Sequence, residues 1–184
     1  MTHPILPRSR VLSTTRRKWT GVAVISIAAH HGMELAAGIG VPGEPLIDRR
    51  PAVLAWGALF PLQLAVASVG ERRWDRVLAA ANGSFQALAL QHYLSWRWRL
   101  RCGIPTLTET EGLPARWLPG YNLALLAAIV SSTIGSATEC PTAERRWHLW
   151  GLATLPAQYA SARHHSAWLR GRDPIEREES DAPR

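Results

Sequence analysis

The sequence predicts an all-α protein, a polytopic membrane helix bundle of about five helices. Three stretches without Asp, Glu, Lys or Arg support this prediction: residues 51–70, 77–96 and 117–138. About 20 apolar residues form a helix long enough to cross the hydrocarbon core of a bilayer, whereas core helices of small soluble domains normally carry a charged face. Most of the nine tryptophans lie near the ends of these stretches, and amphipathic rings prefer the headgroup level. The alternative is a soluble helical bundle with tryptophans in its core.

The charge distribution also favours a membrane protein. The chain has 184 residues, enough for one domain, and a formal net charge of +7. The basic residues are scattered among the predicted loops without a nucleic-acid-binding motif, so we interpret them as loops that face anionic headgroups. We therefore expect a multi-pass protein of the cell membrane. Its expected partners are the membrane and a lipid or prenylated small molecule, with no nucleic acid.

The predicted elements begin with a basic N-terminal arm, residues 1–18, followed by a first helix over residues 19–41. Pro42, Gly43 and Pro45 end this helix, because such residues do not continue one. A cleaved signal peptide has a similar pattern. Two histidines interrupt the apolar run and no A-x-A site is evident, so we favour a retained helix.

The remaining helices follow from the same patterns. Pro51 suits the first turn of a helix over residues 51–70, and a short turn makes the helix over 77–96 its antiparallel neighbour. A longer loop precedes a helix over 120–138. A helix over 147–169 has a short apolar part and contains Pro156, so two alternatives stay open: it crosses the membrane, or it is interfacial or only partly inserted. The charged, apolar-poor segment 170–184 predicts a disordered tail.

Three ionisable residues interrupt the first apolar run and are the predicted catalytic residues: His30, His31 and Glu34. Spacings of three and four residues place each imidazole beside the carboxyl group on a helix surface. Ionisable groups inside a membrane are costly and usually face the bundle interior or a wet cavity. We expect Glu34 to act as a general acid, tuned by a histidine. The alternative is a polar cluster that ties the helix to its neighbours.

Amide, aromatic and acidic side chains on the other helices predict a central polar cavity with aromatic walls. The predicted substrate-binding residues are Trp56, Phe60 and Gln63 on one stripe, Asn82, Gln86 and Tyr93 on one face of the next helix, and Glu139 as a possible second acid. Such a pocket suits a large apolar ligand, and aromatic faces also stabilise carbocations.

The sequence predicts neither a metal nor a cofactor. It has no Walker loop, GxSxG or HExxH motif, and its seven histidines do not reproduce the multiple histidine boxes of membrane di-iron hydroxylases. A metal held by the first-helix cluster and His92 is a geometric alternative. Cys102 and Cys140 have no zinc-site spacing and fall in different predicted loops, so we expect no disulfide between them.

Two classes of function fit these features, and the sequence does not decide between them. In size, helical make-up and an acid on an early helix, the chain resembles the small membrane-integral terpene cyclases of bacteria. This resemblance implies acid–base chemistry on an isoprenoid or lipid, with protonation of an olefin or epoxide. The alternative is a non-enzymatic membrane protein, such as a carrier subunit, immunity factor or assembly factor. In that case His30, His31 and Glu34 would form a proton relay or a packing cluster.

Overall fold

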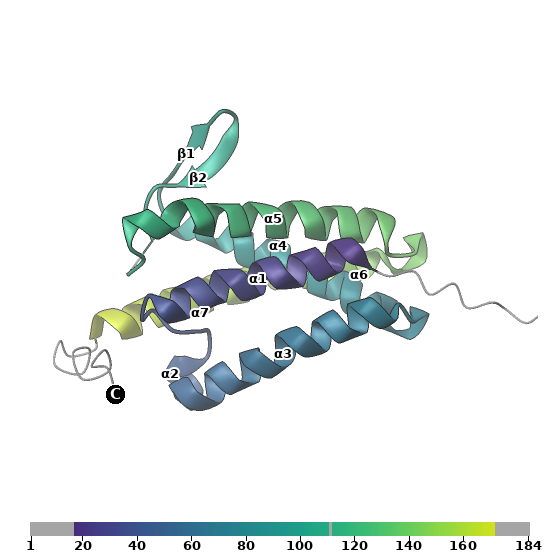
Figure 1. Cartoon of the computed structure of the whole chain (residues 1–184), viewed down its shortest axis with the longest axis horizontal. Coiled ribbons are helices and arrows are strands. Elements are labelled where there is room, and N and C mark those ends of the chain that lie inside the picture. Colours follow the sequence, from purple (N-terminus) through teal and green to yellow (C-terminus); the bar gives the residue numbers. More distant parts are fainter. Residues whose placement is uncertain (1–16, 111, 172–184) are drawn as a thin grey trace, which may run out of the picture.

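A computed structural model describes residues 17–110 and 112–171, and these residues form a mainly helical bundle (Figure 1). The all-α prediction is therefore confirmed in outline. The long helices are α1 (Lys18–Ala36), α3 (Arg49–Val69), α4 (Asp75–Ser95) and α5 (Leu118–Thr138). Most of the predicted N-terminal arm and C-terminal tail lies outside the described residues. Arg17 and Lys18 instead adjoin or begin α1, and Arg170 belongs to the last turn of α7 (Leu155–Gly171).

The first helix ends at Ala36, five residues before the predicted end at position 41. Gly38 and Gly40 have φ of 76° and 94°, and a right-handed helix cannot pass through such a backbone. A short helix that the sequence did not predict, α2 (Glu44–Ile47), follows this turn. The buried Glu44 carboxylate accepts a hydrogen bond from the Val41 backbone N–H at 2.8 Å, which fixes the turn.

The predicted helix over 147–169 is in fact two helices, α6 (Arg146–Leu152) and α7. The break falls immediately before Pro156, the second residue of α7. Proline lacks the N–H of an internal helical residue but is tolerated in a first turn. Pro156 indicated this break in the sequence, so the prediction of a single helix was wrong here.

The predicted loop over 97–119 contains a β-hairpin, β1 (Trp98–Arg101) paired antiparallel with β2 (Ile104–Leu107). Its turn residues Cys102 and Gly103 have φ of 49° and 79°, the left-handed conformation that tight hairpin turns require. The hairpin projects sideways from one end of the bundle (Figure 1). Three short 3-10 helices complete the described secondary structure: η1 (Arg72–Trp74), η2 (Ala115–Trp117) and η3 (Thr142–Glu144).

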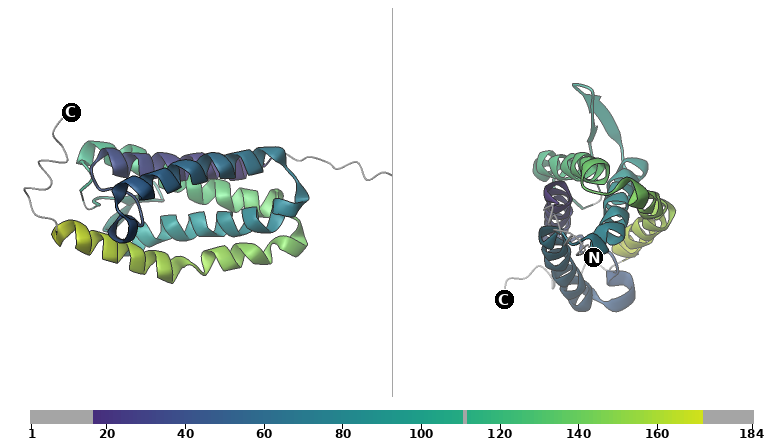
Figure 2. Two further views of the ribbon diagram at one scale, coloured as in Figure 1. Left: turned by 90° about the horizontal axis from the view of Figure 1, so that it is seen from below. Right: turned by 90° about the vertical axis from the view of Figure 1, so that its right-hand side faces the viewer.

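The helices pack in an order that leaves α3 apart from α6 and α7. α1 packs on α5 and α3, while α4 packs on α5, α6 and α7. In the end-on view of Figure 2, α3 and the α6–α7 pair lie on opposite sides of the molecule. This arrangement brings α3 and α7 to opposite walls of one cavity, described below.

α4 and α6 approach each other at Gly83 and Gly151. A Cβ atom on Gly83 would overlap the backbone carbonyl oxygen of His148, and one on Gly151 would overlap that of Ala80. Only glycine permits this backbone contact. Small residues serve the same purpose between helices in membranes.

Two of the described helical segments are long and apolar enough to cross a membrane, Arg49–Val69 and Ala115–Thr138. This is fewer than the predicted five and, by length and composition, only weakly suggests membrane association, because a buried core helix passes the same test. α4 falls short because polar residues within it, among them Asn82, Gln86, Gln91 and His92, lower its mean hydropathy. In the Arg49–Val69 window only 11 % of the residues are buried inside the bundle.

Candidate functional site

The candidate site lies where the last turns of α1 and α4 meet the first turn of α5. It consists of His30, His31 and Glu34 of α1, His92 of α4 and Tyr121 of α5. The four ring side chains are buried and Glu34 is half-buried. The helix period places the three α1 residues on one side of its final turns, as their spacing predicts. Long-range packing adds the other two.

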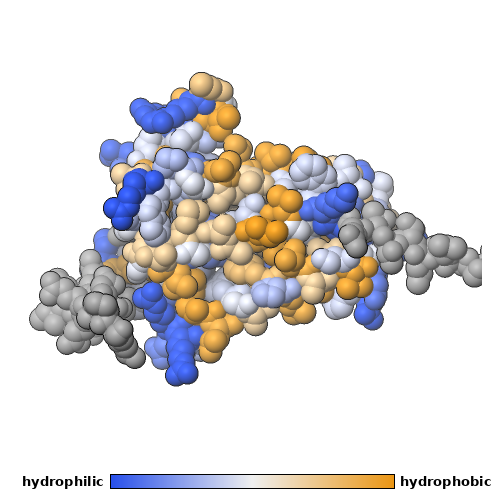
Figure 3. Space-filling view, viewed as in Figure 1, coloured by the Kyte–Doolittle hydropathy of each residue, from blue (hydrophilic) through white to orange (hydrophobic). Residues whose placement is uncertain are grey.

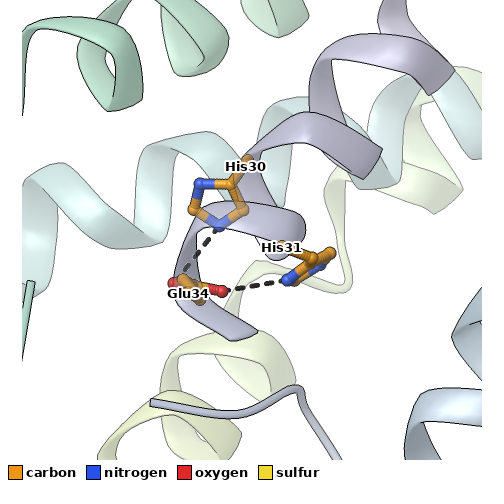
Figure 4. A group of neighbouring side chains, drawn as sticks. All are labelled: His30, His31 and Glu34. Carbon is orange, nitrogen blue, oxygen red and sulfur yellow. Dashed lines mark hydrogen bonds and ion pairs between the residues drawn. The ribbon is translucent and has the colours of Figure 1, made fainter. Parts of the chain in front are cut away.

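Glu34 is the centre of this cluster and contacts three of its members. The Tyr121 hydroxyl donates to Glu34 Oε1 at 2.7 Å. His31 Nδ1 lies 3.0 Å from Oε2, and His30 Nε2 lies 3.4 Å from Oε1. Figure 4 shows both histidines directed at the carboxyl group. One proton can therefore sit on either partner of the Glu34–His31 pair: as a carboxylic acid facing a neutral imidazole, or as a carboxylate facing an imidazolium.

The members of the cluster differ in their access to a ligand. The side chain of Glu34 is 12 % exposed, against 0 % for His30 and 4 % for His31. Neither ring nitrogen of His30 has a hydrogen-bond partner among the described residues. Its ring instead packs against those of His92 and Tyr121, with centroid distances of 4.7 Å and 4.5 Å. Glu34 is therefore the proton-carrying group that is most accessible, with the rings packed around it.

Two aromatic residues of α3 extend the cluster into an aromatic wall. The ring centroids of Trp56 and Phe60 lie 4.8 Å and 5.9 Å from that of His31. The Trp56 indole N–H donates to the carbonyl oxygen of Pro42 at 2.9 Å, which orients the ring. Trp56 and Phe60 also contact each other at 5.4 Å. The predicted stripe on this helix is therefore adjacent to the predicted catalytic residues.

A cavity of about 950 Å³ opens beside this cluster, between α3 on one side and α4, α6 and α7 on the other. Glu34, His31, His92 and Tyr121 line it, as does the predicted residue Gln63. The Gln63 amide oxygen is buried without a hydrogen-bond partner among the described residues. The volume lies in the range of small-molecule sites, which are mostly apolar with a few placed polar groups.

Glu139 and Asn82 lie at the opposite end of the bundle. The Glu139 carboxylate accepts hydrogen bonds from the backbone N–H groups of Trp19 and Thr20 at 2.6 Å and 3.0 Å, and so caps α1. Asn82 donates to the Thr20 hydroxyl at 2.9 Å. Thr20 and Glu34 are fourteen residues apart on one helix, or roughly 21 Å. The structure thus does not bring these two predicted residues to Glu34, and neither of them lines the cavity.

Gln86 and Tyr93 also face away from the cluster. The Gln86 amide donates to the Thr133 hydroxyl of α5 at 2.6 Å. The Tyr93 hydroxyl is 3.4 Å from the Pro105 carbonyl oxygen, which connects α4 to the hairpin. Neither residue lines the cavity. Both contacts link neighbouring elements.

His92 and Tyr121 are the functional candidates that the sequence prediction left out of its site. Both are polar aromatic residues within apolar helices, which was the available signal. Nothing in the local spacing relates Tyr121 to Glu34, 87 positions earlier. Their place in the cluster follows from the packing of α1, α4 and α5.

The α1 residues also form a group that could hold a metal ion. His30, His31 and Glu34 each offer one ligand atom, and these atoms lie within 4.8 Å of one another. Ligands at 2.0–2.1 Å from a tetrahedral zinc ion lie about 3.4 Å apart, so closure around an ion would require the side chains to move. The hydrogen bonds already made by Glu34 fit a proton-holding cluster without such movement.

No family model matches the chain, and comparisons with curated proteins and with solved structures gave no match.

Proposed function

We propose that the protein is a small multi-pass membrane enzyme that uses acid–base chemistry on an isoprenoid or lipid, with Glu34 as the proton-transferring group. The observation that supports this most directly is the half-buried Glu34 carboxyl group at the wall of an apolar cavity, paired with His31 and hydrogen-bonded by Tyr121. A proton-holding group beside a mainly apolar cavity suits a substrate whose reacting atom is carbon.

The surface of the bundle supports the membrane part of the proposal. Large apolar side chains are exposed on several helices: Val22 and Ile25 on α1, Leu54 and Leu62 on α3, Leu90 and Leu94 on α4, and Leu123 and Val130 on α5. In Figure 3, hydrophobic residues spread over the middle of one face, while strongly hydrophilic residues lie toward the two ends and on the hairpin. Apolar side chains exposed over the middle of the bundle, with hydrophilic residues toward its ends, match a hydrocarbon layer between two headgroup layers.

The proposed reaction is balanced without a cofactor. The Glu34 O–H protonates one carbon of a double bond, or an epoxide oxygen, leaving a carbocation and the carboxylate. Trp56 lines the cavity beside His31 and supplies cation–π stabilisation, whereas Phe60 packs behind it and does not line the cavity. Loss of a proton from a neighbouring carbon then forms a new double bond and returns the proton to the Glu34–His31 pair. The net result is isomerisation. In a cyclisation, a second double bond of the same chain first attacks the carbocation, which forms the ring bond and moves the positive charge to the carbon whose neighbour then loses the proton.

Deuterium incorporation tests this role directly. Purified protein in lipid nanodiscs is incubated in deuterium oxide with farnesol, geranylgeraniol and their 2,3-epoxides, and the products are analysed by mass spectrometry. Wild-type protein should place deuterium on carbon of the two alcohols, and it should convert the epoxides, whose oxygen takes the deuterium, into isomeric or cyclic alcohols. Glu34→Gln should lower the rate by roughly 100-fold or more, the usual size of a general acid–base contribution.

Glu109→Gln is the matched control, because this exposed carboxylate pairs with Arg97 outside the cavity. Full activity of Glu34→Gln would overturn the assignment of Glu34. Binding of the isoprenoids by wild-type protein without any incorporation would instead support the non-enzymatic carrier. If Glu34→Gln fails to accumulate, Tyr121→Phe takes its place. This variant keeps the aromatic ring and removes one hydrogen bond to Glu34, so lost activity in protein that accumulates normally reports on the chemistry and not on packing.

A further inference from the structure

The cavity is elongated along α4. Its lining includes residues from Val77 in the first turn of α4 to Trp96 just beyond the last, a path of roughly 28 Å at 1.5 Å per residue. Between these ends the wall is made mostly of apolar side chains: Ala80, Ala81, Phe85 and Leu88 of α4, with Leu59 of α3 opposite. This shape and lining suit a long apolar chain.

One end of the cavity carries positive charge. Arg163, Ser166 and Arg170 of α7 line it, and spacings of three and seven residues place them along one side of a helix. α7 contains no Asp or Glu. Among the described residues that line the cavity, basic side chains outnumber the single carboxylate, Glu34, although Arg170 also has an interaction partner of its own. Arg163 is further held over the ring of Tyr159, 5.9 Å from its centroid.

The basic side chains and the proton-transferring cluster lie at the same end of the bundle. The backbone N–H of Ile39 donates to the carbonyl oxygen of Glu34 at 2.9 Å. His165, within the basic part of α7, has its Nε2 2.9 Å from the carbonyl oxygen of that same Ile39. A charged head at α7 would therefore lie near Glu34, with its chain extending toward α6.

We infer that the cavity binds a single-chain anionic amphiphile, a phosphate or diphosphate ester of a prenyl chain, with its head at Arg163, Ser166 and Arg170 and its tail along α4. Arginine and hydroxyl groups are strong donors to phosphate oxygens, and the apolar wall accounts for the tail. The prenyl identity of the tail rests on the proposed function, whereas the anionic head rests on α7 alone.

The test compares three probes: geranylgeranyl diphosphate, geranylgeraniol and inorganic diphosphate. Binding to the full chain in phosphatidylcholine nanodiscs is followed by quenching of tryptophan fluorescence, since Trp56, Trp147 and Trp150 line the cavity. Wild-type protein should bind the ester roughly tenfold or more tightly than the alcohol. The double variant Arg163→Gln/Arg170→Gln should lose this preference and retain its affinity for the alcohol.

The matched control is Arg99→Gln/Arg101→Gln, which removes the same charge from the hairpin, outside the cavity. It should keep the preference for the ester. Equal binding of ester and alcohol by wild-type protein, or a preference that survives in the α7 double variant, would overturn the inference. So would inorganic diphosphate binding as tightly as the ester, because the tail would then contribute nothing.

Nanodiscs that contain phosphatidylglycerol distinguish a prenyl ester from a membrane phospholipid. If that lipid abolishes binding of the ester to wild-type protein, the head site belongs to phospholipid and the inference fails. If deuterium incorporation depends on Glu34 but the α7 double variant leaves the preference for the ester unchanged, only the head site is overturned. Arginine-dependent binding with a fully active Glu34→Gln overturns the proposed function alone.

Discussion

At the scale of single residues, Glu34 and Glu139 show how position decides the role of a carboxyl group. Glu34 contacts two imidazoles and a phenol at the wall of the cavity. Glu139 receives the first backbone N–H groups of α1, where a negative charge also favours the helix dipole. The chemistry we propose concerns Glu34. Glu139 caps α1 and therefore contributes to stability.

We therefore expect Glu139→Gln to lower stability by about 1 kcal/mol, the usual contribution of a helix cap, with little effect on the chemistry. Thermal unfolding in detergent, followed by circular dichroism, measures the stability. Deuterium incorporation per mole of folded protein measures the activity. Glu71→Gln is the control, because the Glu71 side chain is exposed and pairs with the exposed Arg73. Unchanged stability with lost incorporation would instead support the prediction of Glu139 as a second acid.

The predicted α1 cluster was accessible from the sequence because its three members are neighbours on one helix. Spacings of three and four residues fix their separation whatever else the chain does. His92 and Tyr121 join them through contacts between helices, which local spacing does not encode. Asn82 and Gln86 show the opposite case. Their spacing places them on one face of α4, but Asn82 bonds to α1 and Gln86 bonds to α5, so they do not form one site.

At the scale of elements, the α4–α6 crossing positions the cavity. α6 and α7 hold the wall opposite α3, and Gly83 and Gly151 allow α6 to touch the backbone of α4. The Gln158 amide of α7 continues the contact by donating to the Ser84 carbonyl oxygen at 3.1 Å. A side chain at the crossing would push this wall away from α4.

Gly83→Ala should accordingly lower the free energy of unfolding by about 2 kcal/mol, within the range for overpacked sites. Gly57→Ala on α3 is the matched control, because no atom outside its own helix lies within 4 Å of its added Cβ, and alanine has the higher helix propensity. Thermal unfolding of both variants measures the difference. Equal melting temperatures would show that the helices do not meet at Gly83.

The hairpin shows why element type can escape prediction. Trp98, Arg99, Leu100 and Arg101 alternate between apolar and basic residues, which is a strand pattern. Glycine and proline in the same segment indicated a loop, and that interpretation was wrong. The pairing of Trp98 with Leu107 and of Leu100 with Pro105 gives the hairpin one apolar face, while Arg99 and Arg101 lie on the other.

At the scale of the whole molecule, the two free cysteines make the membrane topology testable. Cys102 is exposed at the tip of the hairpin, before α5, and Cys140 is buried after it. Burial raises the pKa of the Cys140 thiol to about 11, so near neutral pH this group stays protonated, and the thiol is far less reactive than the thiolate. Cys102 should therefore be the site of labelling by a maleimide in the wild-type protein.

If α5 spans the membrane, Cys102 and residue 142 lie on opposite sides. Sealed vesicles of one orientation should allow an impermeant maleimide to label either wild-type Cys102 or the variant Cys102→Ser/Thr142→Cys, but not both, until detergent is added. Thr142 is exposed in η3, so its replacement is accessible. Labelling of both from one side would place α5 in a soluble or interfacial bundle.

The separation of α3 from α6 and α7 has a consequence for kinetics. α3 packs mainly on α1, yet it and α7 both line the cavity, so the space between them faces the surroundings sideways rather than along the helix axes. In a bilayer, a ligand that enters by this route arrives from within the leaflet. Its effective concentration is then its mole fraction among lipids, and inert lipid added at constant total ligand would act as a diluent.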